Sequence, residues 1–163
     1  MKRPLLPVVL LTCSVLLAAC DATPPAVSTL MQQVTQACQA GDEKALKACF
    51  AKEGVTADQI NTHLGSWDAY FTKSSDPQYA YTYSGIRYVS LADAPNDKSF
   101  LPDMITMAQP TTVGGMKFAP NIKVIGFIVV SFKMANGVPV GPIEDVGIDS
   151  DGSAKIALSE PQK

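Results

Sequence analysis

The spacing of apolar residues divides the chain into a helical N-terminal part and a C-terminal part made of strands. Between residues 27 and 71 apolar side chains recur every three or four positions, which is the period of a helix face. This spacing predicts three helices, over about 27–40, 42–53 and 57–74, with breaks at Gly41 and Gly54. Their apolar faces carry Val27, Leu30, Met31, Val34 and Cys38, then Leu46, Cys49 and Phe50, then Ile60, Leu64, Trp67 and Phe71.

From residue 79 onward the pattern becomes the alternation typical of strands. Tyr79, Tyr81 and Tyr83 alternate, and Gly85 marks a predicted bulge before the run 86–91. Residues 121–134 are apolar on both faces in the middle, which predicts a central strand. An Asn-Gly pair at 136–137 predicts a hairpin, and 138–149 and 154–158 return as strands, whereas 92–120 shows no clear element.

Helices followed by strands in this order predict an α+β fold. The three N-terminal helices are expected to pack together on one face of a mostly antiparallel sheet. One domain over 27–160 accommodates all of these elements, because its length is that of a single core.

The first twenty residues have the pattern of an export signal. Lys2 and Arg3 form a basic start, and the apolar run 5–17 is too short for a membrane span. The end of this run, Leu17-Ala18-Ala19-Cys20, resembles a bacterial lipobox, which implies cleavage before Cys20 and acylation of its thiol. We therefore predict a signal peptide at 1–19 and a lipidated tether at 20–26, the alternative being a plain secretory signal cut elsewhere.

Loss of that signal changes the charge and the cysteine count. It leaves 144 of the 163 residues and moves the net charge from −2 to −4, which disfavours nucleic acid as a partner. The predicted location is the periplasmic face of a bacterial membrane, and Asp21 after the cysteine resembles an inner-membrane retention signal. In that oxidising compartment Cys38 and Cys49 are expected to form a disulfide, the alternative being two buried free thiols.

The segment Ala40-Gly41-Asp42-Glu43-Lys44-Ala45-Leu46-Lys47-Ala48-Cys49-Phe50-Ala51 adds a resemblance to a family. It is similar to the helix-turn-helix opening of the NTF2-like (SnoaL-like, cystatin-like) superfamily. The resemblance implies a strongly curved sheet wrapped round a long helix, with a conical pocket between them. It implies no single function, because this fold hosts enzymes, carriers and binding modules.

Two carboxylates are candidates for proton transfer in such a pocket. Counting by twos from Val140 places Glu144 on the inward face of its strand, whereas a bulge at the Gly141-Pro142 pair would turn it outward. Asp68 follows Trp67 on the third helix, where a solvated flank is the alternative role. An acid in an apolar pocket has a raised pKa and can act as a base near neutrality.

The remaining chemistry is sparse. The single histidine, His63, excludes a zinc helix with two histidines and lies at the edge of an apolar stripe, where a packing role is common. No cofactor or metal site is predicted, because the Asp149-x-Asp151-Gly152 turn lacks the later ligands of a calcium loop. Four aromatic residues are candidates for lining the pocket: Trp67, Tyr81, Tyr83 and Tyr88.

These features favour a lipid-anchored, non-catalytic module that binds a protein or a small apolar ligand in the cell envelope. One alternative is a small-molecule isomerase or cyclase that uses Glu144 or Asp68 with a tyrosine. Another is an inhibitor or immunity-type lipoprotein, and a homodimer is a further expectation from the family resemblance.

Overall fold

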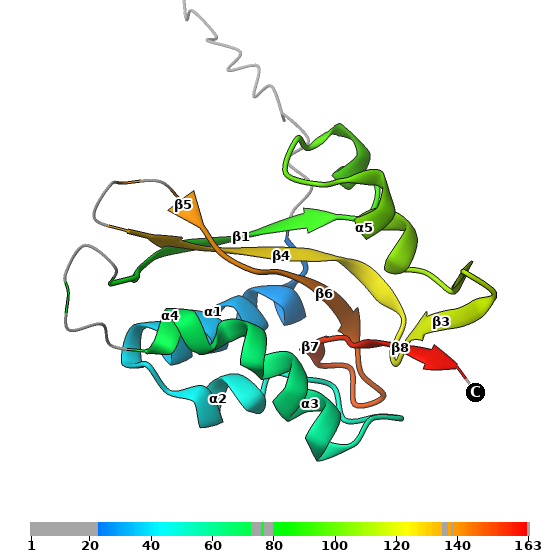
Figure 1. Ribbon diagram of the computed structural model, residues 1–163, viewed down its shortest axis with the longest axis horizontal. Coiled ribbons are helices and arrows are strands. Elements are labelled where there is room, and N and C mark those ends of the chain that lie inside the picture. Colours follow the sequence, from blue (N-terminus) through cyan, green and yellow to red (C-terminus); the bar gives the residue numbers. More distant parts are fainter. Residues whose placement is uncertain (1–22, 73–75, 77–79, 135–136, 138, 163) are drawn as a thin grey trace, which may run out of the picture.

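The computed structural model describes residues 23–72, 76, 80–134, 137 and 139–162. The predicted signal peptide 1–19, the predicted acylation site Cys20, Asp21, Tyr79 and Asn136 lie outside the described residues. Helices and antiparallel strands form an α+β structure (Figure 1). Within the described ranges, no helix combines the length and the apolarity needed to cross a bilayer.

The helical part is divided into more pieces than the spacing predicts. Helix α1 covers Pro25–Ala40 and α2 covers Glu43–Lys47. Helix α3 covers Ala57–Leu64 and is followed by a 3-10 turn at Gly65–Trp67 and by α4 at Asp68–Phe71. The predicted second helix therefore ends early, at Lys47 and not at the Gly54 break, and the third is interrupted by the 3-10 turn. Helix α4 ends where Thr72 turns to extended backbone.

Local capping sets these boundaries. Gly41 has a φ of 64°, a left-handed conformation in which glycine ends α1 at little cost. The Asp42 side chain accepts a hydrogen bond from the Ala45 amide and begins α2. Thr56 and Gln59 form the predicted capping box at the start of α3.

The main sheet has five antiparallel strands. Its principal order is β1 (Thr82–Ser90), β4 (Val124–Lys133), β6 (Ile143–Ile148) and β7 (Ala154–Ile156), and the short β5 (Pro139–Val140) also pairs with β4. The β1–β4 register shifts between Tyr83 and Gly85, so the predicted bulge is present. Strand β4 lies between β1 and β6, which confirms its predicted central position.

The segment 92–120 and the C-terminus build smaller elements beside this sheet. A 3-10 turn at Ala94–Asn96 leads to α5 (Pro102–Met107). Strands β2 (Thr111–Val113), β3 (Met116–Pro120) and β8 (Ser159–Gln162) form a separate three-stranded sheet.

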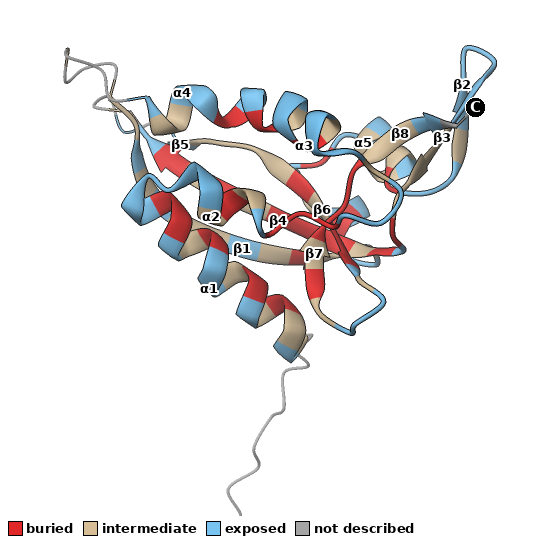
Figure 2. Ribbon diagram, turned by 90° about the horizontal axis from the view of Figure 1, so that it is seen from below, coloured by how far each residue is buried: buried red, intermediate tan, exposed pale blue. Residues whose placement is uncertain are grey.

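Two apolar clusters cover the two faces of the main sheet. Helices α1–α4 lie on one side of it and α5 lies on the other (Figure 1). Buried positions gather on the helix faces turned to the sheet (Figure 2). In β4, Ile128, Val130 and Phe132 belong to the cluster under the helices, whereas Phe127 belongs to the cluster with Phe100 and Ala108 on the opposite side.

Candidate functional site

Glu144 is the buried ionisable residue around which the polar side chains under the sheet are arranged. It lies on β6 opposite Ile128 of β4 and is 4% exposed. The pairings of Phe132 with Val140 and of Val129 with Ile143 share one register, so Gly141 and Pro142 introduce no bulge against β4. Counting by twos therefore gives the inward orientation correctly.

Gly141 makes this register possible. A Cβ atom at this position would lie 1.9 Å from the carbonyl oxygen of Val130, well inside any real contact distance. The absence of a side chain lets the strand pass close to β4, and the Val130 amide donates to the Pro142 carbonyl at 3.0 Å.

Both carboxylate oxygens of Glu144 have partners from the third helical segment. Trp67 Nε1 donates to Oε1 at 2.8 Å, and His63 Nε2 donates to Oε2 at 2.8 Å. His63 and Trp67 are four residues apart, so they project from the same side of the helix. A buried carboxylate is tolerated when hydrogen bonds replace its water, and these two donors do so.

His63 connects this carboxylate to the surface. Its side chain is 36% exposed, and its ring meets Phe50 edge-on with centroids 5.5 Å apart. The hydrogen bond to Glu144 raises the pKa of His63, and burial opposes that rise. The pair is thus held as an imidazolium against a carboxylate over a wider pH range than a free histidine allows.

Asp145 adds a second carboxyl next to this pair in the chain. Burial, and then the negative charge of Glu144, raise the pKa of Asp145 to about 7, while His63 acts in the opposite direction. Asp145 pairs with Phe127, whose side chain is in the cluster on the opposite face of the sheet. Alternation along the strand therefore places the two carboxyls on opposite faces.

The other predicted residues do not join this cluster. Asp68 is exposed at the start of α4, and its carbonyl accepts a hydrogen bond from Thr72. The Tyr81 ring packs edge-on against Tyr70, with ring centroids 5.0 Å apart. The hydroxyls of Tyr83 and Thr35 form a hydrogen bond of 2.7 Å. The Tyr88 hydroxyl donates to the Ile125 carbonyl at 3.1 Å. With the buried Trp67 these rings belong to the apolar cluster under the helices, so they serve as packing there.

The predicted disulfide is not formed in the structure. Cys38 and Cys49 are both buried free thiols, and the Cys49 thiol donates to the Ala45 carbonyl at 3.6 Å. Burial, and then the neighbouring Cys49, raise the pKa of Cys38 to about 12. Thiols in such surroundings stay protonated and pack as small apolar groups, which is the physical reason that they are stable here without a bond.

The partner of His63 does not follow from the local sequence, because Glu144 is 81 positions away. The available signal was the inward carboxylate itself, since a buried carboxylate requires donors and the 63/67 spacing offers two of them on one helix face.

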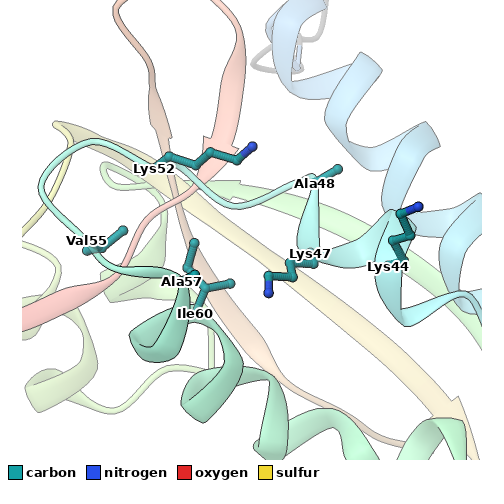
Figure 3. Close-up of a pocket in the computed structure, with 7 residues that line it drawn as sticks. All are labelled: Lys44, Lys47, Ala48, Lys52, Val55, Ala57 and Ile60. Carbon is teal, nitrogen blue, oxygen red and sulfur yellow. The ribbon is translucent and has the colours of Figure 1, made fainter.

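A surface pocket lies between α2 and α3. Its volume is about 430 Å³, within the range of small-ligand sites. Ile60 and Val55 supply apolar surface, and Lys44, Lys47 and Lys52 surround it (Figure 3). The other lining residues are Ala48 and Ala57.

The sequence does not predict this pocket, because Ile60 belongs to the apolar face of one segment and the lysines to the polar side of another, and only the packing of the two segments brings them together. Lys47 Nζ donates to Asn61 Oδ1, and Figure 3 shows its ammonium directed toward α3. Lys44 and Lys52 make no side-chain hydrogen bond or ion pair within the described part of the chain. Lys44 and Lys52 thus differ from Glu144, both of whose carboxylate oxygens accept a hydrogen bond inside the fold.

Comparison of the chain with protein-family models, with curated proteins and with solved structures gave no significant match. The resemblance to NTF2-like chains therefore rests on the residues of the sequence alone. Among the described residues, no three His, Cys, Asp or Glu side chains lie together as a metal site would require.

Proposed function

We propose that the chain is a lipid-anchored, non-catalytic binding module at the periplasmic face of a bacterial membrane, and that it takes its ligand in the pocket between α2 and α3. The observation that carries this proposal is the pocket itself, with apolar side chains and two lysines that have no partner in the described chain.

The arrangement of Glu144 disfavours the isomerase or cyclase alternative. A general base must lie within hydrogen-bond reach of the proton that it removes. Glu144 is 4% exposed and is held by hydrogen bonds from His63 and Trp67, which limits the access of a substrate to its carboxylate. Asp68, the other candidate, is exposed and lies outside this cluster.

The anchor in this proposal rests on Leu17-Ala18-Ala19-Cys20 and on the short distance to the fold. Helix α1 begins at Pro25, five residues after Cys20, so the domain would be held close to the lipid surface. The order of helices before antiparallel strands also supports an NTF2-like arrangement with three N-terminal helices. In this proposal the conical interior is filled by packing, and binding takes place on the helical side.

Photolabelling of the full chain in membranes tests the binding site. We expect an uncharged alkyl diazirine to modify Val55 and Ile60, identified by mass spectrometry after proteolysis. Ala57→Trp should fill the pocket and reduce this labelling at least fivefold. Ala69→Trp, at an exposed alanine of the neighbouring α4, is the matched control and should leave it unchanged. Equal labelling in both variants would contradict the site.

Fractionation tests the anchor separately. Cys20→Ala should remove acylation and leave the chain unprocessed or released from washed membranes. Retention of this variant in carbonate-washed membranes as a processed chain would contradict lipid anchoring while leaving the pocket in place.

A further inference from the structure

The charges around the pocket are of one sign. Lys44, Lys47 and Lys52 line it, and none of its seven lining residues is acidic. The acidic residues next to these lysines in the sequence, Glu43, Glu53 and Asp58, are exposed and do not line the pocket.

The same segment holds acidic residues that could have paired with these lysines. The Asp42 carboxylate instead caps α2 through the Ala45 amide, and Lys47 donates to a neutral amide on Asn61. Lys44 and Lys52 remain without an ion pair in the described chain. Figure 3 shows the three ammonium groups directed to different sides of the pocket, and the flexible lysine side chains let each of them turn toward a bound anion.

The surface between the lysines is apolar and deep enough for more than an ion. Ile60 is buried, Val55 is half-buried, and Ala48 and Ala57 complete the lining. A simple anion would leave this surface in water, whereas an alkyl group would cover it at a gain that scales with the area buried.

We infer that the pocket binds a single-chain anionic amphiphile, with its carboxylate or phosphate among Lys44, Lys47 and Lys52 and its alkyl chain on Val55 and Ile60. This inference rests on the proposed function, since it names the ligand of the same pocket. It commits to a free amphiphile and not to a bilayer headgroup, because the apolar surface inside the pocket needs an alkyl group that a bilayer keeps in its own interior.

Lysine footprinting on the full chain in phosphatidylcholine vesicles tests this inference. Reductive methylation, read by mass spectrometry, reports the accessibility of each ammonium. Decanoate and decyl phosphate should slow the modification of Lys44 and Lys52 about threefold or more. Lys98, Lys117 and Lys123 are outside the pocket and serve as internal controls, which should not change.

Four further probes separate the sources of protection. Decyltrimethylammonium should give none, because its charge has the wrong sign. Inorganic phosphate alone should give much less than decyl phosphate, and equal protection would show a simple anion site and overturn the inference. Protection by phosphatidylglycerol vesicles without protection by decanoate would show a bilayer headgroup and overturn it as well. If decanol protected Lys44 and Lys52 as well as decanoate does, the negative charge would not be needed for binding, and the inference would be overturned.

Variants complete the test and separate it from the proposed function. Lys44→Gln with Lys52→Gln should weaken decanoate binding about five- to tenfold, as expected for two exposed charge pairs, and added salt should reduce the difference. Lys98→Gln with Lys117→Gln is the matched control and should have no effect. If the uncharged diazirine labels the pocket but decanoate protects no lysine, the anionic ligand is wrong and the binding site stands. If neither probe acts there, both proposals fail.

Discussion

The helix α3 borders two charged regions that differ in how their charges are satisfied. Under the sheet, the Glu144 carboxylate is enclosed and both its oxygens accept hydrogen bonds from His63 and Trp67. At the surface, Lys44 and Lys52 border an open pocket with no partner in the described chain. The comparison teaches that a charge with its partners inside the fold contributes to stability, whereas a charge that lacks them is available to a ligand.

Removal of the buried Glu144 carboxylate should have the largest effect on stability and tests the difference between the two regions most directly. Glu144→Ala leaves the Trp67 N–H buried without an acceptor and takes the counter-charge from His63. We expect the free energy of unfolding to fall by about 3–5 kcal/mol, the usual cost of removing one partner of a buried pair. Urea denaturation measures it, and the exposed Glu53→Ala is the matched control. A loss below about 1 kcal/mol would show that the cluster is not structural.

The sequence predicted the elements better than it predicted the contacts among them. Apolar spacing located the helical region, the central strand 121–134 and the Gly85 bulge, because burial imposes a period on each element. It left the orientation of Glu144 open between the inward count and a bulge at Gly141-Pro142, and only the strand pairing decides for the inward one. The early end of α2 at Lys47 and the 3-10 turn at Gly65–Trp67 depend on tertiary packing, and the spacing alone did not predict them.

The candidate site was harder to predict, since its pairs are distant in sequence. His63 and Glu144 meet only because α3 crosses beneath β6, and no local pattern records that crossing. Tyr83 and Tyr88 are on β1 as predicted, whereas Tyr81 precedes the strand, and all three pack against the apolar cluster as partly buried rings. The lysine pocket needs the angle between α2 and α3, which follows from packing and not from periodicity.

The pH dependence of stability gives a second test of the enclosed region. The pKa of Asp145 is raised to about 7, so the native state binds a proton more tightly than the unfolded chain does. The stability from this group is complete below about pH 4 and is lost as the pH rises toward 7. The pKa of His63 is also raised, so its contribution is complete below about pH 6.5 and is lost at higher pH.

Asp145→Asn isolates the first of these effects. We expect the variant to match the natural chain near pH 4 and to exceed its free energy of unfolding by about 1–2 kcal/mol at pH 8, a figure reduced for partial solvent exposure. Asp97, whose pKa Arg87 lowers to about 2, acts in the opposite direction but is fully ionised above pH 4. Denaturation curves at pH 4, 6 and 8 measure the difference, and a constant offset across them would contradict the assignment.

A smaller effect on stability is expected for the two buried thiols in the apolar cluster under the helices. Because Cys38 and Cys49 are free and buried in the structure, Cys49→Ala should cost about 1 kcal/mol through lost packing, with or without a reductant. A disulfide would instead add a stabilisation of about 2–3 kcal/mol that a reductant removes. Denaturation in both conditions distinguishes the two states, and a cost that falls sharply on reduction would restore the predicted bridge.

The smallest expected effect on the free energy of unfolding is at the surface pocket between α2 and α3. Replacing Lys44 and Lys52 together by glutamine removes two exposed ammonium groups that make no ion pair in the described chain. The free energy of unfolding should change by less than about 0.5 kcal/mol in either direction, because surface substitutions away from paired groups have effects of this size. The same double variant should lose decanoate binding five- to tenfold, so its stability and its binding respond separately. A stability loss above about 1 kcal/mol would show that these lysines have partners inside the fold, and the contrast with Glu144 would disappear.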